Sequence, residues 1–167
     1  IRKTIPLIIK KYKIKTIFDA ACGDFYWMRF VINNKLNYIG GDIVKKIIEL
    51  NKKKYKKKKI NFIHSDLTKK DLPKVDLIIC RDALTHLPLD MGIRAKKKFV
   101  KSKSKYLLST TYSNINKNID ILKGNFRPIN LLKNPYTFGK PLLLINEKCT
   151  EKNLKYKKKC LGLWKIN

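Results

Sequence analysis

The chain has 167 residues, a length that fits one domain spanning residues 1–167. A hydrophobic content of 44% supplies a core and excludes wholesale disorder, and the apolar runs are too short for a membrane span. The net charge is +28, from 40 Lys and Arg against 12 Asp and Glu. Only five of these forty are Arg, the side chain that suits phosphates and base edges best, so we attribute most of the lysines to an AT-rich genome. An anionic partner for this basic protein remains the alternative, because a basic surface attracts polyanions.

Cysteine and histidine positions predict no metal site. The cysteines never fall at C-x-x-C spacing, and there are two histidines: Cys22, Cys80, Cys149, Cys160, His64 and His86. Scattered cysteines in apolar segments indicate a reducing, cytoplasmic compartment. The sequence begins at Ile1 without a signal peptide, and we expect the natural N-terminal start to be missing.

The first half of the chain alternates strands and helices. A helix begins near Ile5, with Pro6 in its first turn. Apolar runs and helical spacing then predict, in chain order, a strand at 16–21, a helix at 25–31, a strand at 37–42, a helix at 43–55 and a strand at 60–64.

The second half continues this alternation and then changes. We predict a strand at 75–80, a helix around 93–100 and a strand at 106–111. Residues 112–141 form a long loop region rich in Pro and Gly, and such loops are often functional. Two further strands are expected, at 142–146 and 161–166. Strands alternating with helices favour an α/β fold with a Rossmann-like, doubly wound parallel sheet and helices on both faces.

Acidic residues follow several of the predicted strands. The turn after the first strand is small and contains Gly23, which lets the backbone approach a ligand, although a tight turn needs glycine anyway. Asp42 ends the second strand 19 residues later, where such folds bind ribose hydroxyls. Asp66 follows the third strand, and Asp76 opens the fourth. A single turn glycine serves a pyrophosphate poorly, so a nucleoside ligand fits better.

These motifs, in this order, resemble class I S-adenosylmethionine-dependent methyltransferases. The segments that carry the resemblance are 18–24, Gly41-Asp42, 65–67 and 76–82, and residues 124–131 are similar to small bacterial and viral methyltransferase-domain proteins. The resemblance implies a seven-stranded sheet with an antiparallel last strand and S-adenosylmethionine as cofactor. For a viral protein, the compartment would be the host cytoplasm.

The resemblance also implies cofactor contacts, from the following residues: Asp19, Ala21, Cys22 and Gly23 for the methionine moiety, Asp42 and Ile43 for the ribose, Asp66 and Leu67 for the adenine, and the backbone near Cys80 and Arg81 for the methionine amine. The sequence departs from the glycine-rich turn of the family at two positions. Ala21 replaces the first glycine, and Phe25 replaces the last, where it would narrow the pocket or lie over the cofactor.

The segment after the fourth strand holds the candidate catalytic residues. His86 is suited to accept a hydroxyl proton near neutral pH, and Asp82, four residues earlier, could orient its imidazole if the turn is helical. Alternatively, His86 caps a short helix and Asp82 bonds only to backbone. His64 is expected simply to end a strand.

Two residues are candidates for binding the acceptor. Arg127 could clamp a carboxylate or phosphate, or form an internal salt bridge with an acid such as Glu147. Tyr112, with Tyr136 and Phe138, could wall a pocket or simply pack in the core.

The resulting hypothesis is methyl transfer to a small-molecule or saccharide hydroxyl, without a membrane partner. One alternative is an RNA methyltransferase that uses the lysine-rich surface. The other is a non-catalytic nucleic-acid-binding or scaffold domain that kept the fold.

Overall fold

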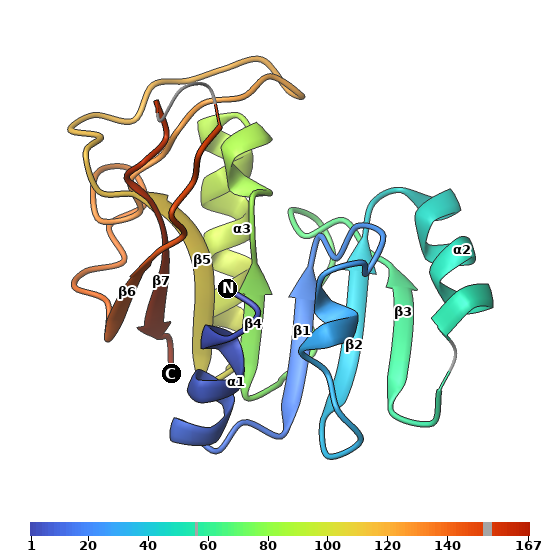
Figure 1. The fold of residues 1–167 in the computed structure, drawn as a ribbon. Coiled ribbons are helices and arrows are strands. Elements are labelled where there is room, and N and C mark those ends of the chain that lie inside the picture. Colours follow the sequence, from blue (N-terminus) through green and yellow to red (C-terminus); the bar gives the residue numbers. More distant parts are fainter. Residues whose placement is uncertain (56, 152–154) are drawn as a thin grey trace.

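A computed structural model describes residues 1–55, 57–151 and 155–167 and shows a layered α/β architecture (Figure 1). The strands are β1 (Thr16–Ala20), β2 (Asn37–Asp42), β3 (Ile60–His64), β4 (Leu77–Cys80), β5 (Tyr106–Tyr112), β6 (Leu143–Asn146) and β7 (Lys159–Lys165). The helices are α1 (Thr4–Lys11), α2 (Lys45–Tyr55) and α3 (Leu89–Lys101), with short 3-10 turns η1 (Met28–Phe30) and η2 (Leu84–His86). None of the helices in the described residues is long and apolar enough to cross a membrane.

All seven strands belong to one sheet, in the order β3-β2-β1-β4-β5-β7-β6. Strands β1 to β5 pair in parallel, and β7 runs antiparallel to both β5 and β6. The predicted Rossmann-like sheet with an antiparallel last strand is therefore confirmed. Parallel strands place their carboxyl ends at one edge, where doubly wound folds bind ligands.

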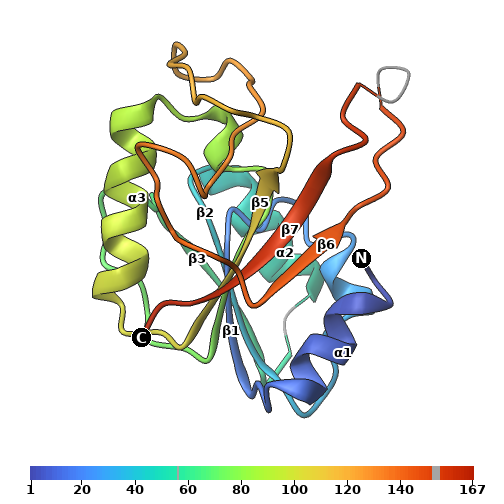
Figure 2. The same cartoon turned by 90° about the vertical axis from the view of Figure 1, so that its left-hand side faces the viewer.

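Helices cover both faces of the sheet, as the strand and helix alternation predicts. Ile5 and Ile8 of α1 and Ile48 of α2 join one buried cluster, whereas Ala95 and Phe99 of α3 join a second. Figure 2 shows α1 and α3 on opposite sides of the strands. The burial of alternate strand residues into two separate clusters follows from the two-residue period of side chains along a strand.

The predicted helix at 25–31 is wrong. The chain there forms only the 3-10 turn η1, because Phe25 adopts a left-handed backbone conformation (φ +60°) that interrupts a helix at its first residue. The other predicted helices and strands are present, with ends shifted by a few residues.

Residues 113–142 contain no helix or strand, in agreement with the predicted irregular region. The segment is nevertheless tied to the fold at η2: the Gly124 N–H donates to the His86 carbonyl (3.2 Å), and the Arg127 N–H donates to the Thr85 carbonyl (3.0 Å). It thus lies against the segment that follows β4.

Candidate functional site

The turn after β1 is built for close approach by a ligand. The N–H groups of Ala21 and Cys22 both donate to the Gly41 carbonyl (2.8 and 3.0 Å), which fixes the turn against β2. Ala21 and Gly23 adopt positive φ angles of +76° and +55°. A Cβ added at Gly23 would meet nothing within 4 Å, so the space above this residue is open.

Phe25 does not lie over this open space, which corrects the expectation from sequence. Its ring is buried (1% exposed) among Tyr38, Tyr55 and Phe62, with ring centroids 4.9 to 5.2 Å apart. The aromatic ring gains more from burial in this cluster than from exposure at the mouth of the turn. Phe25, at the position of the last glycine of the family's turn, therefore leaves the open space at Gly23 clear.

Asp42 lies directly beneath the turn, as its spacing from Gly23 predicts. The Gly23 N–H donates to Oδ2 (3.0 Å), and the Val44 N–H donates to Oδ1 (2.9 Å). From α2, the side-chain amide of Asn51 donates to the Gly23 carbonyl (2.7 Å). The carboxylate is thus held in one orientation, and each oxygen keeps a lone pair with which to accept a hydroxyl. Ile43, the next residue, is half exposed.

Asp19 is the most perturbed acid at this edge. It is 2% exposed and accepts a hydrogen bond from the Tyr38 hydroxyl (2.8 Å). Burial raises the pKa of Asp19 from 3.8 to about 7, although the bond from Tyr38 opposes this change. A cationic group bound beside this carboxyl would favour its ionised form.

Asp66 follows β3 at the same edge. The backbone N–H and the hydroxyl of Thr68 both donate to Oδ1 (2.8 and 2.7 Å). Burial opposes ionisation, but these bonds lower the pKa of Asp66 below its ordinary value. Leu67 beside it is half-buried. Asp76, in contrast, lies at the opposite edge, where it accepts the Thr16 N–H (3.0 Å) and pairs with Lys105 (2.8 Å).

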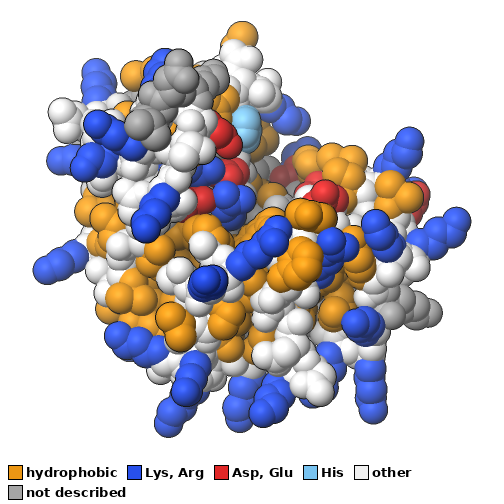
Figure 3. Space-filling model, viewed as in Figure 1, with side chains coloured by type: hydrophobic (Ala, Val, Ile, Leu, Met, Phe, Trp, Pro, Cys, Tyr) orange, Lys and Arg blue, Asp and Glu red, His pale blue; other side chains and the backbone are white. Residues whose placement is uncertain are grey.

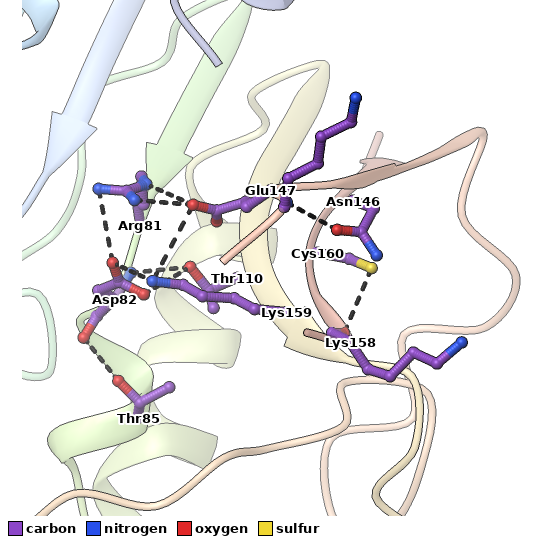
Figure 4. Close-up of polar contacts among 10 residues, drawn as sticks. Arg81, Asp82, Thr85, Thr110, Asn146, Glu147, Lys158, Lys159 and Cys160 are labelled. Carbon is purple, nitrogen blue, oxygen red and sulfur yellow. Dashed lines mark hydrogen bonds and ion pairs between the residues drawn. The ribbon is translucent and has the colours of Figure 1, made fainter. Parts of the chain in front are cut away.

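The end of β4 carries a network of four charges (Figure 4). The Arg81 guanidinium donates twice to Oε2 of Glu147 (2.7 and 3.2 Å), and Lys159 Nζ lies 2.8 Å from Oδ2 of Asp82. Thr110 of β5 donates to the other oxygen of Asp82 (3.2 Å). Despite the burial that opposes its charge, the bond to Glu147 raises the pKa of Arg81.

This network corrects the expected role of Asp82. Its carboxylate points to Thr110, Lys159 and Arg81, and the described contacts do not pair it with His86. The reason is local: Asp82 has a positive φ of +60°, and helical geometry begins only at η2. Sequence analysis missed Glu147 and Lys159 as members of the network. Both residues are far along the chain from their partners, and one lysine among many gives no signal.

His86 ends η2 and is exposed. Its Nδ1 lies 3.2 Å from the Asn125 carbonyl, and its ring centroid lies 5.5 Å from that of Phe126. A carbonyl oxygen only accepts hydrogen bonds, so Nδ1 donates in this contact, and in the neutral imidazole Nε2 then carries the lone pair. The loop at 125–126, rather than Asp82, therefore orients the imidazole. His64 ends β3 and contacts the Ile43 carbonyl through Nε2 (2.9 Å).

Arg127 is not placed to bind an acceptor. It is 2% exposed, and its guanidinium donates to the carbonyls of Ile119, Leu84 and Thr85 and to the Tyr136 hydroxyl. The alternative salt bridge to Glu147 is wrong as well, because Glu147 pairs with Arg81. Arg127 instead anchors the irregular segment to η2.

The predicted aromatic wall also belongs mainly to the core. Tyr112 is 2% exposed, and its ring packs edge-on against Tyr156 with centroids 5.9 Å apart. Burial raises the pKa of Tyr112 well above its ordinary value. Tyr136 is fully buried, and Phe138 packs on Trp164 (5.6 Å). Phe126, which sequence analysis did not select, is the exposed ring beside His86.

At the carboxyl edge of the sheet, these residues form one site. The open turn, the carboxylates of Asp19, Asp42 and Asp66, and the end of β4 lie along neighbouring strands, and His86 lies six residues after the end of β4. In the view of Figure 3, acidic, basic and histidine side chains meet in a hollow at the upper edge of the molecule.

Comparison with known proteins assigns the chain to a family. Residues 17–102 match the family model described as "Methyltransferase domain", and the chain belongs to this family. Comparison with curated protein sequences gives no match.

Solved structures share the fold at low sequence identity. The methyltransferase domain of bacterial CtHen1 superposes with a TM-score of 0.73 at 14% identity, covering 98% of this chain and 95% of that chain. A S-adenosylmethionine-dependent methyltransferase from Clostridium acetobutylicum gives 0.72 at 13% identity, covering 98% and 89%. Magnesium protoporphyrin IX methyltransferase from Synechocystis, with bound S-adenosylmethionine, gives 0.70 at 13%, covering 97% and 77%. The protein is thus a S-adenosylmethionine-dependent methyltransferase, and S-adenosylmethionine is its cofactor.

Proposed function

We propose that the protein transfers the methyl group of S-adenosylmethionine to a hydroxyl group of a small molecule or saccharide, with His86 as general base. The observation that carries this proposal is the contact between Nδ1 of His86 and the Asn125 carbonyl (3.2 Å). Because this contact favours a proton on Nδ1, the neutral imidazole would carry its lone pair on Nε2, on an exposed residue about one turn after β4. A hydroxyl must lose its proton as it attacks the methyl carbon, and a positioned imidazole can accept it.

The residues of the turn fit the cofactor. The open space at Gly23 admits a ligand against the backbone, and Asp42 can accept hydrogen bonds from both ribose hydroxyls. Asp19 and the backbone at Arg81 would both face the amino group of the methionine moiety. Oδ2 of Asp66 would accept a hydrogen bond from the adenine amine. When bound, the cofactor supplies an electrophilic methyl group. The chain contributes orientation, because displacement at carbon requires the nucleophile in line with the departing sulfur.

The aromatic ring of Phe126 supports the acceptor side of this proposal. It is exposed, lies beside the His86 imidazole, and packs against Tyr156 (5.4 Å). A flat ring next to the base can hold one face of a sugar or of another ring system.

A methyl-transfer screen tests the function. The protein is incubated with S-adenosylmethionine labelled on its methyl group and with sugars, small hydroxy acids or RNA, and label transfer is measured. The proposal expects transfer to oxygen, with turnover reduced in His86→Gln at unchanged cofactor affinity. Cofactor binding without transfer to any acceptor would favour the non-catalytic scaffold. Label found only in RNA would favour the RNA methyltransferase.

The cytoplasmic location of the protein stays a prediction.

A further inference from the structure

Two arginines and two aromatic rings form an exposed cluster beside the cofactor turn. This Arg–aromatic patch consists of Arg2, before α1, and Tyr26, Arg29 and Phe30, in and before η1. The Arg2 guanidinium lies 4.4 Å from the centroid of Phe30, and that of Arg29 lies 4.6 Å from both rings. The rings stand edge to face at 5.9 Å and are 51% and 53% exposed.

The arginines of the patch are not explained by lysine-rich composition. The chain has five arginines among forty Lys and Arg, yet two of the five meet here from segments about 27 residues apart. Arginine differs from lysine in its planar guanidinium, which stacks on rings and binds phosphates in a fork. A compositional drift toward lysine predicts lysine at both positions.

A groove continues from the patch along α2. It has a volume of about 520 Å³ and runs between the turn at Asp24 and Tyr26 and the end of the helix, where Lys53, Lys54 and Tyr55 line it. Lys54 Nζ lies 5.4 Å from the centroid of the Tyr55 ring. Asp24, an acid that lines the groove, accepts a hydrogen bond from the Tyr26 N–H (2.9 Å). The patch and the groove together offer exposed rings at one end and two lysines at the other.

We propose that the Arg–aromatic patch and this groove bind single-stranded nucleic acid. Bases stack on the rings of Tyr26 and Phe30 and on the guanidinium planes, while Lys53 and Lys54 contact phosphates. Aromatic platforms in a basic groove are the physical requirement for binding unpaired bases without sequence preference. An acidic protein would use the charges but not the half-exposed aromatic rings. This binding goes beyond the proposed methyl transfer and does not depend on it.

The test separates stacking from charge. Binding of the whole chain to a fluorescein-labelled 12-nucleotide single-stranded RNA is measured by fluorescence anisotropy at 150 mM salt. The same is done with a 12-unit abasic chain, which has the phosphates but no bases. The proposal expects the abasic chain to bind at least tenfold more weakly, the scale of the loss of one or two stacked bases.

Variants locate the site. Arg29→Gln is expected to weaken RNA binding at least fivefold and Tyr26→Leu with Phe30→Leu at least tenfold. Arg94→Gln is the matched control, because it removes the same charge from an exposed arginine on α3, which is paired with Asp90. Cofactor affinity confirms that each variant is folded. Equal binding of the abasic chain, or equal losses in Arg94→Gln and Arg29→Gln, would overturn the proposal and leave a general polyanion effect of the lysines.

Discussion

Replacing Asp19 with asparagine should make the protein more stable and a poorer binder of its cofactor. The carboxyl group is buried and 2% exposed, and burial raises its pKa from 3.8 to about 7. Keeping this group ionised in the folded state at pH 8 therefore costs about 4 kcal/mol, at about 1.4 kcal/mol per pH unit. Asparagine has the same shape and still accepts the hydrogen bond from the Tyr38 hydroxyl, but it carries no charge.

The raised pKa of Asp19 determines how the stability of the protein changes with pH. The folded protein binds the proton of Asp19 more tightly than the unfolded chain does, so this group lowers stability as the pH rises from about 4 to about 7. The advantage of Asp19→Asn should thus be absent near pH 4, grow by about 1.4 kcal/mol per pH unit, and level off above pH 7 at about 4 kcal/mol.

Urea unfolding of both proteins at several pH values measures this difference, and calorimetry measures the cofactor affinity. Tyr38→Phe serves as the matched control, because it removes the donor to the carboxylate and should destabilise by about 1–3 kcal/mol. A pH-independent difference between Asp19→Asn and the parent would refute the reasoning. So would an asparagine variant that is less stable than the parent at pH 8.

Three further substitutions test the site. Asp42→Ala should weaken S-adenosylmethionine binding by about 2–3 kcal/mol, and unchanged affinity by calorimetry in the folded variant would contradict the ribose assignment. His86→Ala should reduce turnover by about 10²–10⁴-fold with cofactor affinity retained, whereas near-parental turnover would show that the residue is structural. Arg127→Lys should lower the free energy of unfolding, measured by heat or urea, by about 1–3 kcal/mol, because lysine cannot donate to several carbonyls at once. Cofactor affinity should not change. A variant that loses only acceptor binding would instead support the substrate-binding role.

The sequence was sufficient for the fold and for the position of Asp42 beside the turn at Gly23 because those signals are local. Continuous apolar runs predict buried parallel strands, and an acid placed directly after such a run lies at the carboxyl edge. Asp42 is an example: its distance of 19 residues from Gly23 becomes a hydrogen bond of 3.0 Å in the structure. The helix at 25–31 failed because its prediction rested on apolar spacing alone, which cannot report the positive φ of Phe25.

The network at the end of β4 was less predictable because its contacts join distant segments. Arg81 meets Glu147 across 66 residues, and Asp82 meets Lys159 across 77. No local pattern encodes such pairs, and antiparallel β7 brings its first residue to the same edge as the end of β4 only once the sheet is assembled. Arg127 was misjudged for the same reason: its partners are backbone carbonyls, which have no sequence signature.

The distribution of acids explains how a protein of such high positive charge can hold a cationic cofactor. Only 12 acids oppose 40 basic residues, yet four of the twelve lie along the carboxyl edge of the sheet outside the ion pairs of the described residues: Asp19, Asp24, Asp42 and Asp66. Two more, Asp82 and Glu147, balance the charges of Arg81 and Lys159 at the same edge. The sulfonium and ammonium of S-adenosylmethionine outnumber its single carboxylate, so a surface that was uniformly basic would repel it. Interactions between exposed charges are screened within about 8–10 Å at physiological salt, so the acids at this edge set the local field while distant lysines contribute little. Lysines at solvated positions away from this edge therefore oppose cofactor binding only weakly.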